Sequence, residues 1–197
     1  MYKRQEQHGH IAAVGFDMYC RLVQEEMARM AKQQGAPQQK QLQQPKEELR
    51  LDLNVDAYVP DPYVADTDLK IEIYRRIAGA ASLAELDALE QETLERFGKL
   101  PQPVENLFQI GRIKYLASHL GIISIIQQGR KAILRFAADH PLTGDMLLAV
   151  AQAFPKQIAF QHGKVFQAVL TVDAERDGEK LAFVRQVLHQ FFTLLCL

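Results

Sequence analysis

The sequence predicts an α+β protein in which an antiparallel sheet of hairpins packs with helices. Two pairs of short runs rich in apolar residues lie within 122–136 and 156–172, and each pair is joined by a turn. Segments with apolar residues at three- and four-residue spacing, which is typical of helices, precede, separate and follow these pairs. A Gln-rich stretch at 33–45 divides a first helix from the rest. Strand pairs with helices between them indicate the α+β class.

The bulk composition is that of a globular protein without a specialised surface charge. The chain has 197 residues, 48% of them hydrophobic, and a net charge of −1. A dedicated nucleic-acid binder usually carries a basic surplus. The sequence has no apolar run of about 18 residues and no apolar stretch near its start, so neither a membrane span nor a signal peptide is predicted. Cys20 and Cys196 lie at opposite ends and are expected to be reduced thiols in the cytoplasm.

Residues 11–32 are predicted to form a long helix with an unusually wide apolar face. Two adjacent stripes cover more than half of its circumference, whereas a surface helix usually shows a narrower one. Such a helix either lies within its own domain or lies between two bodies. We favour the second interpretation because a linker follows at once. The stripes consist of Ile11, Val14, Met18 and Leu22, and of Phe16, Tyr19, Val23, Met27 and Met30.

The Gln-rich stretch marks a domain boundary. Residues 33–45 contain two prolines and a glycine and have too few apolar side chains to form a core, so we expect a flexible linker. The sequence therefore divides into a helix at 1–32, a linker at 33–47 and an α+β domain at 48–197. That domain opens with alternating apolar residues within 48–59, which predict a strand that ends at Pro60 and Pro62.

Three helices are predicted next. Residues 66–80 begin with Asp66 and Asp68, whose charges suit the positive end of a helix dipole. Ser82 followed by Glu85 is a capping box that opens a second helix, which Gly98 ends. Its expected core face consists of Leu83, Leu86, Leu89, Leu94 and Phe97. Two prolines at 101 and 103 suit the first turn of a third helix, which runs to about residue 120.

The C-terminal third alternates hairpins and helices. Residues 122–126 and 132–136 are predicted to form a hairpin. A helix at 143–154 follows, then a second strand pair at 156–161 and 164–172. The closing helix spans 179–195 and aligns Leu181, Val184, Leu188 and Phe192.

The sequence contains no set of residues that predicts catalysis or a cofactor. The glycine patterns of phosphate-binding and dinucleotide-binding loops and of the nucleophile elbow are missing. His8 and His10 lack further ligands at metal spacing. The aspartates at 56, 61, 66 and 68 lack the register of a calcium loop and suit turns and caps. We therefore expect no catalytic residues, no metal and no cofactor.

A charged face on the helix within 83–97 allows two interpretations. Glu92 and Arg96 have the i, i+4 order that stabilises a solvated helix. The same face, which consists of Glu85, Glu92, Glu95, Arg96 and Lys99, is also suited to docking on a complementary surface. Composition alone favours the solvated face.

Several stretches together resemble the C-terminal part of bacterial transcription-repair coupling factors. The similar segments are 6–11 (EQHGHI), 14–19 (VGFDMY), 55–61 (VDAYVPD), 74–78 (YRRIA), and 92–97 (ETLERF) with the following Gly98 and Leu100-Pro101. The resemblance covers most of residues 5–125, and beyond Leu134 it rests on element order. His8 replaces the Ser expected in the first segment, and the motor motif which that segment completes is truncated here.

The resemblance implies a regulatory role for a fragment without an activity of its own. The whole protein of this family is an ATP-driven DNA translocase that removes stalled RNA polymerase and recruits the excision-repair damage-recognition protein. Its C-terminal domain docks on an N-terminal repair-protein-like module and masks that recruitment. By position, Glu92, Glu95 and Arg96 match the docking residues. Phe16, Tyr19, Val23 and Met27 would then contact the absent translocase motor.

Two other functions compete with docking. A DNA-contacting accessory domain would use Arg75, Arg76, Arg112 and Lys114 as a local basic strip, with an affinity that falls as salt rises. A hydrolase with an unrecognised site ranks last, because no nucleophile and base can be named.

Overall fold

The computed structural model describes residues 49–197, which form five helices and five strands. The predicted helix at 11–32 and linker at 33–47, with the proposed motor-contact residues Phe16, Tyr19, Val23 and Met27, lie outside the described residues. In chain order the elements are β1 (Arg50–Asp52), α2 (Thr67–Gly79), α3 (Leu83–Phe97), α4 (Gln102–His119), β2 (Ile122–Gln128), β3 (Lys131–Phe136), α5 (Gly144–Ala153), β4 (Ile158–Gln161), β5 (Gln167–Thr171) and α6 (Asp177–Leu195).

The five strands form one sheet in the order β1-β2-β3-β5-β4. The pairs β2–β3 and β4–β5 are antiparallel, as the predicted hairpins require, and β3 also pairs antiparallel with β5. Strand β1 joins β2 in parallel, with Leu51 opposite Ile125, so the sheet is mixed rather than purely antiparallel. A parallel neighbour needs a long crossover connection, and α2, α3 and α4 supply it. The α+β class is confirmed.

The first strand is much shorter than the prediction of 48–59. Only Arg50–Asp52 pairs in the sheet, yet the alternation continues, and Leu53, Val55, Ala57 and Val59 are all buried. Beyond Asp52 the backbone finds partners outside the sheet, because Asn106 of α4 donates to the Asp56 carbonyl at 2.8 Å. An alternation of apolar and polar residues shows that one face of the segment is buried, but not that the segment pairs in a sheet. Here helices rather than strands cover part of that face.

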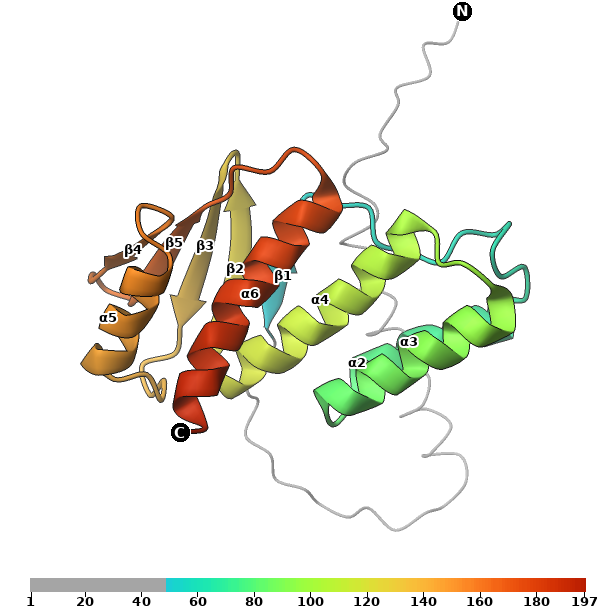
Figure 1. Cartoon of the computed structure of the whole chain (residues 1–197), viewed down its shortest axis with the longest axis horizontal. Helices are drawn as coiled ribbons and strands as arrows, with labels where there is room; N and C mark the ends of the chain where they lie inside the picture. The colour runs from blue at the N-terminus through green and yellow to red at the C-terminus, as the bar shows by residue number, and fades with distance from the viewer. Residues whose placement is uncertain (1–48) are drawn as a thin grey trace, which may run out of the picture.

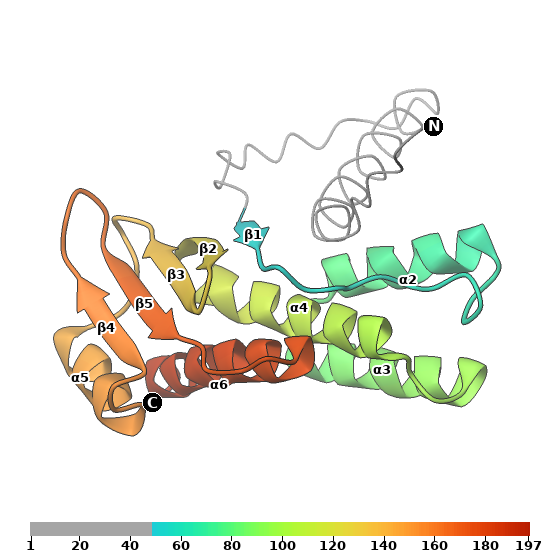
Figure 2. The ribbon, with the colours of Figure 1, turned by 90° about the horizontal axis from the view of Figure 1, so that it is seen from above.

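Helix α4 lies between two groups of helices, α5 and α6 on one side and α2 and α3 on the other (Figures 1 and 2). Helices α4 and α6 pack along each other against one face of the sheet, and α5 packs on α6 near β4. The α2–α3 hairpin lies at the opposite end of the molecule from α5 and β4, where both of its helices contact α4. Helix α4 therefore connects the sheet half of the domain to the helical hairpin.

The predicted helix ends are confirmed. The Asp66 carboxylate accepts hydrogen bonds from the first amides of α2. Ser82 Oγ accepts from the backbone amide of Glu85 at 3.1 Å. In return, the Glu85 carboxylate accepts at 2.8 Å from the backbone amide of Ala81, which is one residue before Ser82, so the capping box is present with this shift. Gly98 ends α3 with a φ of 85°, and Gly121 follows α4 with a φ of 67°. Both values suit glycine.

The core face of α3 differs from the predicted one at a single position. Leu86, Leu89 and Thr93 are buried, whereas Leu94 is 39% exposed. At 3.6 residues per turn, Thr93 continues the face of Leu86 and Leu89, and Leu94 is rotated away by about 100°. The Thr93 hydroxyl is satisfied because it donates to the Leu89 carbonyl at 2.7 Å. A leucine is thus left exposed on the charged side of the helix.

A glycine lets the α2–α3 hairpin approach α4 closely. A Cβ atom at Gly111 would lie 2.7 Å from Cγ2 of Ile77 and 3.3 Å from Cδ2 of Leu86. We expect Gly111→Ala to lower the free energy of unfolding by about 1 kcal/mol, because overpacking of about 1–3 kcal/mol exceeds the gain of about 1 kcal/mol in helix propensity. Urea unfolding measures this change.

Gly79→Ala is the matched control for Gly111→Ala. Gly79 lies at the last turn of α2, and a Cβ atom there would meet nothing within 4 Å. The same substitution at this position should leave stability unchanged or raise it slightly. Equal effects at the two glycines would contradict close packing at Gly111.

Candidate docking surface on helices α2 and α3

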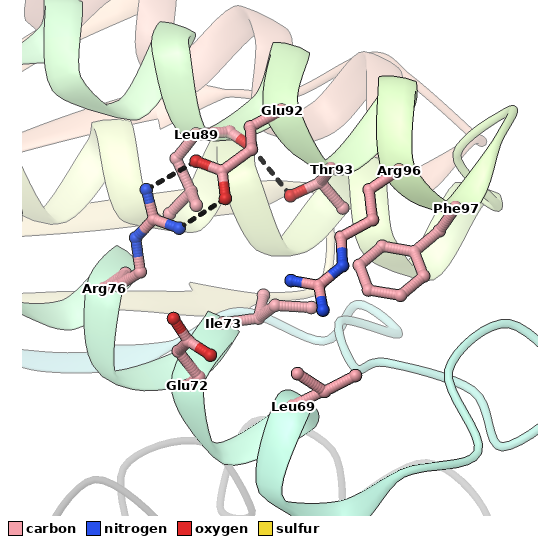
Figure 3. Close-up of a pocket in the computed structure, with 9 residues that line it drawn as sticks. All are labelled: Leu69, Glu72, Ile73, Arg76, Leu89, Glu92, Thr93, Arg96 and Phe97. Atoms are coloured by element: carbon pink, nitrogen blue, oxygen red, sulfur yellow. Dashed lines mark hydrogen bonds and ion pairs between the residues drawn. The ribbon is translucent and has the colours of Figure 1, made fainter.

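The sequence-predicted docking residues are brought together on the exposed side of α3. Glu92, Glu95 and Arg96 are all exposed, and their spacing places them on one face of the helix. Glu92 and Arg96 also line a groove between α2 and α3 (Figure 3), whereas Glu95 is not part of its lining. The full lining consists of Leu69, Glu72, Ile73, Arg76, Leu89, Glu92, Thr93, Arg96 and Phe97.

Glu92 is paired across the groove with a residue of α2. Arg76 donates two hydrogen bonds to it, Nη1 to Oε1 and Nη2 to Oε2, both at 2.7 Å. Such a two-point pair fixes the relative orientation of both planar groups. The hydrogen bond with Arg76 lowers the pKa of Glu92, and the same bond is the main cause that raises the pKa of Arg76. Both side chains stay about half exposed, at 49% and 40%.

The other two predicted residues make contacts within α3 only. The Glu95 carboxylate accepts a hydrogen bond from the side-chain amide of Gln91 at 2.8 Å, which is an i, i+4 contact along the helix. The Arg96 guanidinium lies 5.1 Å from the centre of the Phe97 ring. Neither has an ion-pair partner within residues 49–197. Their charges are therefore available to a partner surface.

Tyr63 holds the end of α3 that carries these charges. Its hydroxyl donates to the Gly98 carbonyl at 3.0 Å and lies 3.4 Å from the Thr93 carbonyl. Its ring contacts the Phe97 ring at a centroid distance of 6.0 Å. Burial raises the pKa of Tyr63. The sequence did not predict a role for this residue, because a tyrosine close to two prolines carries no signal of a contact made 30 or more residues away.

Two arginines of the proposed basic strip, Arg76 and Arg112, are engaged in ion pairs within the domain. Arg112 has a side chain only 7% exposed and donates to Asp87 at 2.6 Å and to Glu90 at 2.5 Å. Burial by itself would lower the pKa of Arg112, but the hydrogen bonds to the two carboxylates raise it. Arg76 is paired with Glu92. Arg112 therefore fastens α3 to α4 instead of offering charge to DNA.

The remaining described surface offers little other chemistry. No group of three His, Cys, Asp or Glu residues within 49–197 is arranged to hold a metal ion. Among the same residues, no helix is both long enough and apolar enough to span a membrane. His8, His10 and Cys20 lie outside the described residues.

The Glu92–Arg76 pair is expected to stabilise the domain only above the acidic range. A carboxyl whose pKa is lowered in the folded state stabilises above its unfolded pKa, and that contribution is lost as the pH falls through the lowered folded value. The pKa of Glu92 is lowered from an ordinary value of 4.5. Glu92→Gln should therefore be less stable than the wild type at pH 7, with the difference shrinking as the pH falls below the ordinary glutamate value of 4.5.

Urea unfolding between neutral and acidic pH measures this difference. Glu95→Gln is the matched control, because Glu95 carries the same charge on the same helix face but has no ion-pair partner among the described residues. A Glu92→Gln deficit that stays constant over the whole pH range would contradict the prediction.

Comparisons with known proteins identify relatives of this chain. Residues 53–147 match the TRCF domain family. A transcription-repair-coupling factor of Haemophilus influenzae is 30% identical over 184 residues, which are 93% of this chain and 16% of that protein. One of Mycobacterium bovis is 41% identical over 124 residues, which are 61% of this chain and 10% of that protein. The chain thus spans a small part of the length of these relatives.

A solved structure has the same fold. The crystal structure of a C-terminal domain of transcription-repair coupling factor superimposes with a TM-score of 0.69, over 75% of this chain and 93% of that chain. The two are 23% identical in sequence. At that identity the likeness shows a shared fold.

Proposed function

The chain carries a TRCF domain and belongs to the transcription-repair-coupling factors, and from this premise we propose that it is their autoinhibitory interaction domain. In this proposal the domain docks on an N-terminal repair-protein-like module of the same cytoplasmic polypeptide. Docking masks the surface that recruits the excision-repair damage-recognition protein. The parent polypeptide supplies the ATP-driven translocase motor that acts on stalled RNA polymerase, and this domain supplies no catalytic group.

The observation that carries the proposal is that Glu92, Glu95 and Arg96 are all exposed on one face of α3, where Glu92 and Arg96 line a groove between two helices. Charged groups of both signs at a surface select the partner and its orientation more than they add affinity. Leu94, which is 39% exposed among these charges, offers an apolar contact beside them. A small, largely polar surface of this kind suits an inter-domain contact that opens and closes.

Masking by docking requires two populated states. In the closed state the domain covers the module, and in the open state the module is free to recruit its partner. A ligand shifts this equilibrium only by the difference between its affinities for the two states. RNA polymerase or DNA bound to the motor would therefore open the domain only if the bound geometry disfavours docking.

Binding in trans tests the proposal. The chain is titrated into the purified N-terminal module of the parent polypeptide and followed by calorimetry. Saturable binding with one-to-one stoichiometry is expected, at a Kd below about 1 mM, which corresponds to about 4 kcal/mol.

A tethered fusion of the two parts detects docking that is too weak for the titration. A flexible linker that joins the two parts raises their effective concentration. Absence of contact in both the titration and the tethered fusion, with both parts folded, would overturn the docking function.

A further inference from the structure

The docking groove contains an internal ion pair that the family resemblance does not include. Arg76 belongs to α2, whereas the three predicted docking residues belong to α3. Its guanidinium reaches across the groove and contacts both oxygens of Glu92 at 2.7 Å (Figure 3). Glu72, one turn before Arg76 on α2, lines the same groove and also acts to raise the pKa of Arg76. The charged surface is therefore built by two helices.

The pair leaves part of the Glu92 carboxylate open. An ionised carboxylate accepts about four hydrogen bonds, two at each oxygen. Arg76 occupies one position on each oxygen, and the Glu92 side chain remains 49% exposed. A cationic group of a partner can therefore reach the outward side of the carboxylate while Arg76 stays in place.

Holding the carboxylate in advance also reduces the cost of binding. A glutamate on an exposed helix face samples several rotamers, and ordering such a side chain at an interface opposes binding. In this domain the two-point contact with Arg76 fixes Glu92 before a partner arrives. The same contact fixes α2 against α3, because the two residues lie on different helices.

We propose that Arg76 is a positioning residue of the docking surface, which holds the Glu92 carboxylate so that its outward side binds a cationic group of the partner. The proposal rests on the docking function argued above and deepens it. The partner surface is accordingly basic where it meets Glu92. Docking then depends on α2 as well as α3.

Charge alone predicts the opposite effect of removing Arg76. The groove and its edge carry the carboxylates of Glu72, Glu92 and Glu95 and the guanidinium groups of Arg76 and Arg96. Loss of Arg76 makes this surface more negative, so simple attraction for a cationic partner would strengthen binding. Positioning predicts weaker binding, because Glu92 becomes free to reorient.

Three single variants separate these effects. Arg76→Met removes the charge and both hydrogen bonds, and Arg76→Lys keeps the charge but loses the two-point geometry. Arg75→Met is the matched control, since Arg75 is the exposed neighbour on α2 and lies outside the groove lining. In the titration against the N-terminal module, Arg76→Met should raise the Kd about tenfold and Arg76→Lys about threefold, with Arg75→Met within about twofold of the wild type.

A charge exchange then distinguishes a docking role from a structural one. Combining Arg76→Glu with Glu92→Arg keeps an ion pair between the helices but reverses its polarity. The Tm should return towards the wild-type value relative to either single change, while docking stays at least about tenfold weaker because the partner's cation now meets a guanidinium.

Two results would overturn the proposal. Either the charge-exchanged domain docks as the wild type does, or Arg76→Met binds more tightly than the wild type. Failure of the wild type to bind, even when tethered, would instead refute the docking function itself. The wild-type titration therefore comes first and the variants are compared with it.

Discussion

The combined change Glu92→Ala, Glu95→Ala and Arg96→Ala is expected to abolish docking while the domain stays folded. These side chains supply the charges that are proposed to choose the partner, and each truncation leaves an opposite charge of the partner unpaired at the interface. We expect the Kd to rise at least about a hundredfold, which corresponds to about 2.7 kcal/mol. Calorimetric titration against the N-terminal module measures it.

The fold should survive this change because all three side chains are exposed. The triple substitution removes the Glu92–Arg76 pair, the Glu95–Gln91 hydrogen bond and the packing of Arg96 over Phe97. Exposed ion pairs contribute about 0–1 kcal/mol each. Circular dichroism and the Tm should therefore remain close to those of the wild type.

A control with the same residue types is available at the N-terminal end of α6. Glu175 and Arg176 directly precede α6 and Glu179 lies in its first turn, and all three are exposed. Their combined change to Ala removes the same charges but leaves the groove untouched. It should bind the N-terminal module within about twofold of the wild type. Equal losses in both triple variants would show that docking responds to overall charge and has no particular site.

The features that sequence predicted well are those that depend on neighbouring residues. The Ser82–Glu85 capping box, the Asp66 cap and the two glycines after α3 and α4 are decided within one helical turn, and each is present. The hairpin β2–β3 is similarly local, since its strands are joined at Gly129 with a φ of 59°. These residues satisfy backbone groups beside them, so their types alone indicate the structure.

The features that sequence missed depend on contacts between distant segments. The parallel pairing of β1 with β2 joins residues more than 70 positions apart, and nothing near Arg50 signals its partner. Arg112 looks like a free cation until α3 brings Asp87 and Glu90 to it. Arg76 likewise becomes part of the candidate site only because α2 lies beside α3. The resemblance named the charged residues of α3, and the fold shows which neighbours hold them.

Leu107→Ala is expected to destabilise the whole domain by about 2–5 kcal/mol. Leu107 lies in α4 and is 0% exposed. Ten of the 18 residues of α4 are buried, far more than a surface helix shows, because the sheet with α6 covers one side and the α2–α3 hairpin covers another. A cavity left by truncating a buried side chain of α4 therefore weakens packing in the sheet half and in the helical hairpin.

Leu148→Ala is the matched control, because it makes the same change in the interior of α5, where Leu148 is 58% exposed. Its effect should stay within about 0.5 kcal/mol. Hydrogen exchange distinguishes how Leu107→Ala acts: protection should fall together in β2–β3 and in α3, because both pack through α4. Loss confined to one half would mean that the α2–α3 hairpin unfolds separately from the sheet. Loss in both would mean that the groove formed by α2 and α3 is only as stable as the sheet half to which α4 joins it.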